Sequence, residues 1–340
     1  METSAARQQS LQGGPVATAE ITYLRSELQE RRERLHSALH SAGADASLSN
    51  LLTQVDAALT RIQAGTYGIC ETCHESIEAD RLLADPLLQF CLDHLPVEER
   101  RALESDLALA ARIQRGLLPP RGFSPAGWNV HYHYAPAGAV SGDYCDLLET
   151  PEGLLFLLGD VSGKGVAASM LMSHLHATFR SLAGANAPLD RMVELANHLF
   201  CESTLAGQYA TLVAGRASSD GRVEFISAGH LPLLHLSRKG TVARDSTGVP
   251  LGMFCDTQFP VHRFVLEQGD SVLLFTDGFT EARNASGDEY TLRRIRDFAG
   301  KLHTAAPDRL IAECLSDLRD FTNGARQKDD LTLLAVQRSA

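Results

Sequence analysis

Four aspartates stand at the ends of short apolar runs in this sequence, and they predict a site for hard divalent cations. They are Asp143, Asp160, Asp277 and Asp329. The apolar run 154–158 leads to Asp160, and the run 272–275 leads to Asp277. Apolar runs of this length are typical of buried strands, so we expect the carboxylates at the rim of a sheet. Carboxylate oxygens are the ligands that Mg²⁺ and Mn²⁺ prefer in proteins.

A second group of residues has the spacing of a zinc site. Two ligand pairs, C-x2-C and C-x2-H, are separated by seventeen residues, and they supply Cys70, Cys73, Cys91 and His94. Each pair can place two soft ligands on one turn, and two such turns complete a tetrahedron around zinc. The alternative is a set of unliganded thiols in a small helical domain. Paired spacing on both sides favours one bound Zn²⁺.

Four further cysteines are scattered through the chain, and we expect them to be small apolar core residues. They are Cys145, Cys201, Cys255 and Cys314. Residues 1–19 are polar and lack the apolar segment of a signal peptide. These features predict a cytoplasmic protein without a disulfide framework.

The glycine-rich stretch after Asp160 is not a nucleotide-binding P-loop. That motif needs four residues between its glycines and a Ser or Thr after the lysine. Here three residues separate Gly159 from Gly163, and Gly165 follows Lys164. The stretch therefore lacks the hydroxyl that would bind magnesium beside a nucleotide.

The elements that would position the aspartates begin near residue 128. We expect strands at 128–134, 154–159, 209–217, 223–228, 233–237, 262–266, 271–276 and 331–337. Helices are expected at 166–182, 189–201, 291–299 and 307–321. Many strands and few helices argue against regular βαβ alternation. They favour an α+β fold with two stacked antiparallel sheets flanked by helices.

The preceding part of the chain is expected to be largely helical. Helices at 19–41 and 48–64 are separated by a short break, which favours an antiparallel hairpin. A long helix at 96–118 has apolar residues on two sides, which must be covered from more than one direction. It could pack on the following sheet, or it could connect two copies of the chain. We favour a connector that supports a homodimer.

Composition excludes two classes of partner. Hydrophobic residues make up 44% and charged residues 21% of the 340 residues, as in ordinary globular proteins. The net charge of −11 argues against direct nucleic-acid binding through phosphate neutralisation. No apolar run is long enough to span a membrane.

The second half of the sequence resembles the bacterial SpoIIE/RsbU branch of the PPM phosphatases. The matching motifs lie at 111–119, 141–143, 159–165, 209–212, 227–232, 250–252, 276–278 and 329–332. Ser141 stands where the family usually has Gly, and Cys145 where it usually has an aromatic residue. Neither difference removes a carboxylate.

This resemblance implies a PPM-type β-sandwich and a catalytic site with two Mn²⁺ or Mg²⁺ ions. Asp160 would bridge both ions, and Asp277 and Asp329 would complete the first site. The backbone carbonyl of Val161 and the carboxylate of Asp143 would hold the second. Asp330 would be either a further ligand or a hydrogen-bond acceptor next to the ligands.

The function that the resemblance implies is hydrolysis of phosphoserine by a water molecule activated between two metals. The expected substrate is a phosphorylated anti-sigma-factor antagonist of the STAS type. The alternative is a catalytically weak pseudophosphatase that acts as a partner-binding scaffold. Retention of all four aspartates favours the enzyme.

The first part of the chain resembles the DksA/TraR zinc-finger family. The likeness lies in residues 67–73, 77–82 and 86–91, after the helical hairpin. His94 stands where the family commonly has a fourth cysteine, and zinc accepts either ligand. Members of that family bind RNA polymerase through an acidic hairpin tip, whereas the break here contains one acid, Asp45.

Together these features predict the domain organisation. We expect a flexible tail at 1–18, a helical hairpin at 19–64, a zinc finger at 65–95, a connector helix at 96–118 and a phosphatase domain at 119–340. The zinc module would be the input that regulates the phosphatase.

Overall fold

The computed structural model describes residues 18–42, 45–185, 187–205, 207–246 and 248–339. The chain divides into two compact units, Met1–Ser105 and Asp106–Ala340. The predicted tail at 1–18 lies outside the described residues except for Thr18. Gly43 and Ala44, in the predicted break of the hairpin, also lie outside them.

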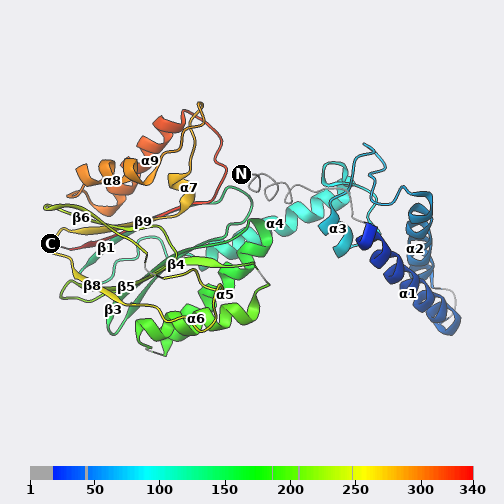
Figure 1. The fold of residues 1–340 in the computed structure, drawn as a ribbon, viewed down its shortest axis with the longest axis horizontal. Helices are drawn as coiled ribbons and strands as arrows, with labels where there is room; N and C mark the ends of the chain where they lie inside the picture. Colours follow the sequence, from blue (N-terminus) through cyan, green and yellow to red (C-terminus); the bar gives the residue numbers. More distant parts are fainter. Residues whose placement is uncertain (1–17, 43–44, 186, 206, 247, 340) are drawn as a thin grey trace, which may run out of the picture. The chain divides into compact units, whose positions relative to one another are not determined.

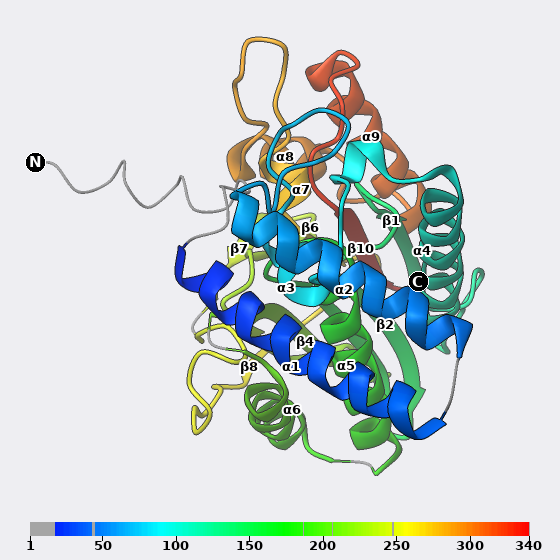
Figure 2. The same cartoon turned by 90° about the vertical axis from the view of Figure 1, so that its right-hand side faces the viewer.

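The first unit is a helical hairpin followed by a small irregular module. Helices α1 (Thr18–Ala42) and α2 (Ala46–Ala64) lie side by side (Figure 2). Their contact buries leucines of α1 and aliphatic residues of α2, among them Leu24, Leu28, Leu35, Val55, Leu59 and Ile62. This spacing puts one apolar face of each helix against the other. The module then contains α3 (Ala79–Ala84) and the 3₁₀ turn η1 (Leu92–His94).

Helix α4 (Val97–Leu117) begins in the first unit and ends in the second. Gln114 is its one buried residue. Leu109 and Ile113 are 45% and 59% exposed. These two apolar residues of the helix are therefore largely uncovered within one copy of the chain.

The second unit contains two five-stranded sheets in which every neighbouring pair is antiparallel. In order across the first sheet, the strands are β1 (Trp128–Ala135), β10 (Leu331–Arg338), β9 (Ser271–Phe275), β6 (Leu233–Ser237) and β7 (Gly240–Arg244). The second sheet has β2 (Asp143–Thr150), β3 (Gly153–Val161), β4 (Ala210–Ala217), β5 (Arg222–Ala228) and β8 (His262–Val265). One apolar layer includes Phe156 and Val213 from the second sheet and Leu274 and Leu334 from the first. The two sheets are thus stacked on a shared core.

Helices cover the outer face of each sheet (Figure 1). Helices α5 (Gly165–Gly184) and α6 (Leu189–Ser203) pack on the second sheet. The first sheet is covered by α7 (Asp277–Thr280), α8 (Leu292–Lys301) and α9 (Pro307–Thr322). The predicted α+β sandwich flanked by helices is confirmed. None of the helices in the described part of the chain is long and apolar enough to cross a membrane.

Two strands are absent from the sequence prediction, each for a physical reason. Strand β2 carries three acids, Asp143, Asp146 and Glu149, and its sequence is typical of a polar turn. In the fold Asp146 is fully buried, because Arg180 donates hydrogen bonds to both of its oxygens at 2.7 and 2.9 Å. Strand β7 is a short strand of five partly exposed residues at the edge of its sheet, and it has no run of apolar residues.

The expectation for two of the scattered cysteines is wrong. Cys145 and Cys314 are buried as predicted. Cys201 and Cys255 instead form a disulfide across 54 residues of sequence. Helix α6 ends near the segment that follows β7, and a sequence alone does not show that this packing brings the two sulfurs together.

Candidate functional site

Strand pairing brings the first two predicted ligands together. Asp143 opens β2 and lies directly opposite Asp160 on the antiparallel neighbour β3. Gly142 precedes this pair, and a Cβ atom there would lie 2.9 Å from the carbonyl oxygen of Val161 and 3.5 Å from a carboxylate oxygen of Asp160. A side chain at this position would therefore intrude on the predicted ligands.

A cavity of about 430 Å³ is lined by Asp160, Val161, Asp277 and Asp329. Asp277 follows β9 as the first residue of α7, and Asp329 precedes β10. The fold therefore brings four of the predicted ligands from separate parts of the sequence to one cavity.

Asp143 lies behind this cavity and is 1% exposed. One of its oxygens accepts hydrogen bonds from the hydroxyls of Thr276 and Thr332. Thr276 directly follows β9 and Thr332 is the second residue of β10, so they tie the second sheet to the first at the site.

The clustered carboxylates have unusual proton affinities. Burial and the charges of Asp277, Asp329 and Asp330 raise the pKa of Asp160 to about 7. Burial and the charge of Asp160 raise the pKa of Asp143 well above its usual value. Burial and Asp329 likewise raise the pKa of Asp277. These shifts indicate that positively charged side chains do not balance the negative charge of the aspartates, as expected of a site that binds multivalent metal ions.

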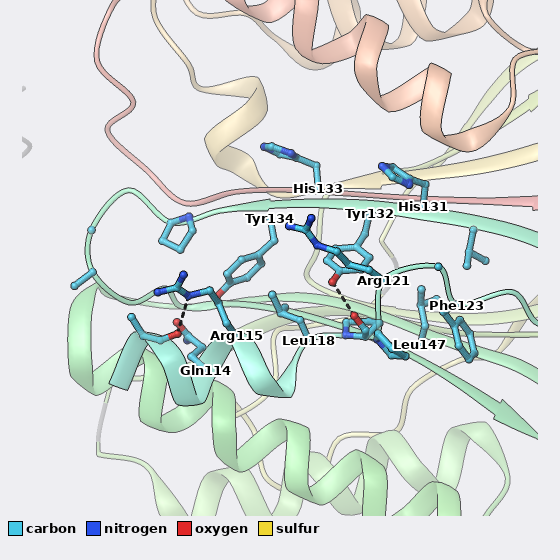
Figure 3. Close-up of a pocket in the computed structure, with 18 residues that line it drawn as sticks. Gln114, Arg115, Leu118, Arg121, Phe123, His131, Tyr132, His133, Tyr134 and Leu147 are labelled. Carbon is cyan, nitrogen blue, oxygen red and sulfur yellow. Dashed lines mark hydrogen bonds between the residues drawn. The ribbon is translucent and has the colours of Figure 1, made fainter. Parts of the chain in front are cut away.

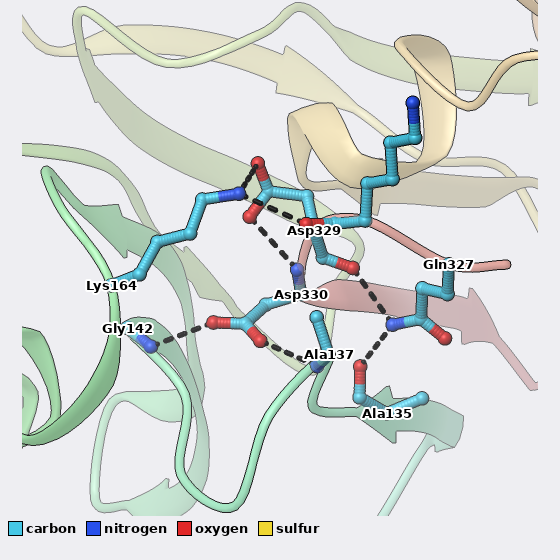
Figure 4. A network of polar contacts seen from close by, with 8 residues as sticks. Ala135, Ala137, Gly142, Lys164, Gln327, Asp329 and Asp330 are labelled. Carbon is cyan, nitrogen blue, oxygen red and sulfur yellow. Dashed lines mark hydrogen bonds and ion pairs between the residues drawn. The ribbon is translucent and has the colours of Figure 1, made fainter. Parts of the chain in front are cut away.

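Lys164 supplies one positive charge to this cluster. Its ammonium group lies 2.8 Å from a carboxylate oxygen of Asp329 and 3.0 Å from the carbonyl oxygen of Lys328 (Figure 4). The hydrogen bond to Asp329 raises the pKa of Lys164. One lysine does not balance the charge of the surrounding aspartates, and the donor set consists of hard oxygens. These residues therefore fit Mn²⁺ or Mg²⁺.

Asp330 holds the loop that leads to Asp143. One of its oxygens accepts a hydrogen bond from the backbone N–H of Ala137 at 2.7 Å, and the other from that of Gly142 at 2.9 Å (Figure 4). Gly278 in α7 lies directly against the backbone of Asp330, since a Cβ atom there would overlap the carbonyl oxygen of Asp330. Of the two predicted roles, the geometry favours the acceptor over the direct ligand.

Gln114 is a site residue that sequence reasoning missed. Its side-chain amide donates to the carbonyl of Ser141 at 2.7 Å and accepts from the N–H of Ser141 at 3.0 Å. The hydroxyl oxygen of Ser141 in turn accepts a hydrogen bond from the N–H of Asp143 at 3.0 Å. Helix α4 is thereby connected to a predicted ligand. Gln114 lies within the motif 111–119 that resembles the phosphatase family, and this is the signal that could have identified it.

The same end of α4 borders a cavity of about 890 Å³ beside β1 (Figure 3). The hydroxyl of Tyr132 donates a hydrogen bond to the carbonyl of Pro119 at 2.7 Å and holds the segment after the helix against the strand. Arg115 and Arg121 also line this cavity. The helix end is therefore attached to the sheet by specific polar contacts.

His230 is on the wall of the aspartate-lined cavity. Its Nδ1 lies 2.8 Å from the hydroxyl of Thr211. Burial lowers the pKa of His230 to about 4. The imidazole is therefore neutral near pH 7, and this favours a structural role over that of a cationic acid.

The cysteine cluster in the first unit has the geometry of a metal site. The ligand atoms of Cys70, Cys73, Cys91 and His94 all lie within 4.8 Å of one another. Burial opposes ionisation of Cys70, but hydrogen bonds from the backbone of Cys73, Cys91 and Thr72 lower its pKa to about 6. Three sulfurs and one nitrogen fit Zn²⁺. Among the described residues this is the one group of at least three possible metal ligands that lies so close together.

Comparisons with protein families match both parts of the chain. The model of Stage II sporulation protein E (SpoIIE) matches residues 150–339, more than half of the chain. The prokaryotic dksA/traR C4-type zinc finger matches residues 65–93, which include three of the clustered ligands and end one residue before His94.

Individual relatives share about a quarter of their residues with this chain. IcfG of Synechocystis is 26% identical over 69% of this chain and 42% of its own length. The phosphoserine phosphatases RsbU and RsbP of Bacillus subtilis are 25% and 29% identical over 70% and 51% of this chain. The alignments cover 72% of RsbU and 44% of RsbP. The chain thus spans less than half of IcfG and of RsbP.

Solved structures agree on the fold. The RsbU and RsbW domains of a Mycobacterium tuberculosis protein are 30% identical, with a TM-score of 0.56 over 63% of this chain and 60% of that one. The SiaA-PP2C domain of Pseudomonas aeruginosa is 18% identical, with a TM-score of 0.64 over 72% and 99%. Both sequence resemblances, to SpoIIE/RsbU and to DksA/TraR, are confirmed.

Proposed function

Since this chain belongs to the SpoIIE family and carries a dksA/traR-type zinc finger, we propose that it is a metal-dependent phosphoserine phosphatase. The observation that carries the proposal is the shared cavity of Asp160, Val161, Asp277 and Asp329, with Asp143 behind it. Two Mn²⁺ or Mg²⁺ ions bound there would lower the pKa of a water molecule and neutralise charge on the phosphoryl group.

The protein's own residues prepare this site in three ways. Asp143, Asp160, Asp277 and Asp329 provide the negative charge, and pairing of β2 with β3 fixes the spacing of the first two. Asp330 and Gln114 both hold the loop 136–142 by hydrogen bonds to its backbone. Lys164 donates a hydrogen bond to Asp329 and holds its carboxylate at the cavity.

The proposed substrate is a phosphorylated anti-sigma-factor antagonist of the STAS type. Support comes from RsbU and RsbP, whose names describe them as phosphoserine phosphatases. No nucleophilic side chain is needed, because an activated water molecule attacks the phosphate directly. Burial lowers the pKa of His230, so its imidazole is neutral near pH 7 and does not act as a cationic acid in the reaction.

The scaffold alternative receives less support. All four acidic ligands are present, although a protein that only binds partners has no use for them. In the first unit, the carboxylate of Asp45 accepts hydrogen bonds from the N–H groups of Ser47 and Leu48 as the cap of α2. This acid is already engaged, which weighs against its use as an acidic tip for RNA polymerase.

We further propose that the zinc module regulates the phosphatase through α4. One end of this helix contacts the ligand-bearing loop through Gln114 and Ser141. Leu109 and Ile113 are exposed one turn apart on the same helix, as a helix that pairs with a second copy requires. A change in helix pairing would then alter the position of Asp143.

The proposal is tested with the purified full-length chain and a phosphoserine-containing STAS-type antagonist. Release of inorganic phosphate that requires added Mn²⁺ or Mg²⁺ supports the enzyme. A folded protein that binds the antagonist but releases no phosphate with either metal would support the scaffold.

A further inference from the structure

A second cavity adjoins the aspartate-lined one. It measures about 520 Å³ and lies between α7, the end of α9 and the segment that leads to β10. Glu281 and Asp329 line both cavities. A substrate whose phosphate lies beside Asp329 would therefore have its neighbouring residues within reach of this second cavity.

The cavity has an apolar floor and a basic rim. Leu315, Leu318 and Leu331 line the floor, and the rim includes Arg319, Arg326 and Lys328. We call these six residues the basic pocket. It combines the features that bind an aliphatic side chain flanked by carboxylates.

The three cations of the rim are exposed and without ion-pair partners among the described residues. Other arginines nearby are paired, such as Arg294 with Asp317 at 3.0 Å and Arg309 with Glu313 at 3.8 Å. Acids outnumber bases in the whole chain, with 42 Asp and Glu against 31 Lys and Arg. Two acids, Glu281 and Asp329, also line the cavity, and Asp329 is paired with Lys164. The unpaired cations remain in excess, which in such a protein indicates an anionic partner.

The wall of the basic pocket is tied to the candidate catalytic site. The side-chain amide of Gln327 donates hydrogen bonds to the carbonyls of Ala135 and Asp329, at 2.7 and 2.8 Å (Figure 4). Arg326 and Lys328 flank this glutamine. The rim therefore has a fixed position relative to Asp329, as substrate selection requires.

We propose that the basic pocket binds the acidic segment next to the phosphoserine of the protein substrate, with an aliphatic side chain of that segment on the leucine floor. This inference rests on the proposed phosphatase function. It adds that the enzyme selects phosphoserines with acidic and aliphatic neighbours.

The test compares phosphoserine peptides of equal length with p-nitrophenyl phosphate, which has no neighbouring residues. One peptide carries Asp, Glu and Leu beside the phosphoserine, one carries Lys and Leu, and one carries Gly and Ser. The full-length chain is assayed in Mn²⁺ beside Arg319→Glu and Arg326→Glu. Arg309→Glu is the control, because Arg309 lies on helix α9 like Arg319 but does not line the pocket.

We expect the wild type to have a kcat/KM for the acidic peptide that is about tenfold higher than for the lysine peptide. This difference should become smaller at high salt. Arg319→Glu and Arg326→Glu should each remove most of this preference by raising KM, whereas Arg309→Glu should keep it. In these two variants the turnover of p-nitrophenyl phosphate should not fall with the loss of peptide preference.

Two results would overturn the inference and leave the phosphatase function standing. One is equal kcat/KM of the wild type for all three peptides. The other is a fall in kcat/KM in both pocket variants that is the same for every peptide and for p-nitrophenyl phosphate. The pocket would then affect the metal site and not the choice of substrate. Absence of turnover with every substrate would instead overturn the phosphatase function, and the inference with it.

Discussion

Asp143 and Asp160 face each other as register partners on the antiparallel strands β2 and β3. Backbone pairing thus holds two carboxylates together independently of any cation. Their mutual repulsion adds to the effect of burial and raises the pKa of Asp143. The apolar layers on both sides of the sheet must offset this cost, and a bound cation would remove it.

The metal-free protein is therefore expected to lose stability as the pH rises. The pKa of Asp160 is about 7 in the folded protein, against an ordinary value of 3.8. Between these values the folded state holds more protons than the unfolded state, so the free energy of unfolding falls as pH rises through this interval. The melting temperature of metal-free protein, measured by calorimetry at a series of pH values, checks this.

Asp160→Asn removes the titration of Asp160, so its effect on the free energy of unfolding can be separated from that of other titrating groups. Metal-free Asp160→Asn should melt about 3 °C or more above the wild type at pH values above about 7, with a gap that narrows as the pH falls. Asp256→Asn, at an exposed loop position, is the control and should show no such trend. A gap that is the same at every pH would contradict the proposed repulsion.

Gln114→Leu should weaken metal binding from outside the ligand set. The change leaves the N–H and carbonyl of Ser141 buried without their partner, which costs about 1–3 kcal/mol. Because Ser141 positions Asp143, we expect Mn²⁺ affinity to fall by about tenfold. Isothermal titration calorimetry measures it, with Arg112→Leu on the exposed side of α4 as control. A lower melting temperature with unchanged Mn²⁺ affinity would limit Gln114 to packing.

The zinc cluster predicts opposite results for two substitutions. His94→Cys supplies another zinc ligand and should retain about one zinc per chain. Cys91→Ala removes a buried ligand and should lose the metal. It should also destabilise the first unit, because Cys70 and Cys91 belong to its apolar core. Metal analysis after gel filtration gives the answer, and retention of zinc by Cys91→Ala would refute this ligand set.

The disulfide between Cys201 and Cys255 predicts a redox-dependent thiol count. Protein unfolded without reductant should expose five free thiols, and all seven cysteines should react after reduction. Closing a loop of 54 residues stabilises the fold by about 4 kcal/mol in the loop-entropy description. Alkylation and mass measurement decide, and seven reactive thiols without reductant would exclude the disulfide.

The parts of the fold that depend on local pattern were predictable. Apolar runs such as 154–158 identified the strands, and the aspartates at their ends indicated the site. Strand β2 was missed because its buried Asp146 depends on Arg180, which lies 34 residues away. The roles of Gln114 and Asp330 also depend on backbone groups of a distant loop. Such contacts leave no periodic signal in a sequence.

The central claim is that the aspartate cluster hydrolyses phosphoserine, and Asp160→Asn tests it most directly. Phosphate release from a phosphoserine-containing STAS-type antagonist is measured in Mn²⁺ for both proteins, with circular dichroism to confirm that the variant is folded. Loss of this central carboxylate should lower the rate by at least about a hundredfold. A folded Asp160→Asn protein that releases phosphate at the wild-type rate would contradict the account.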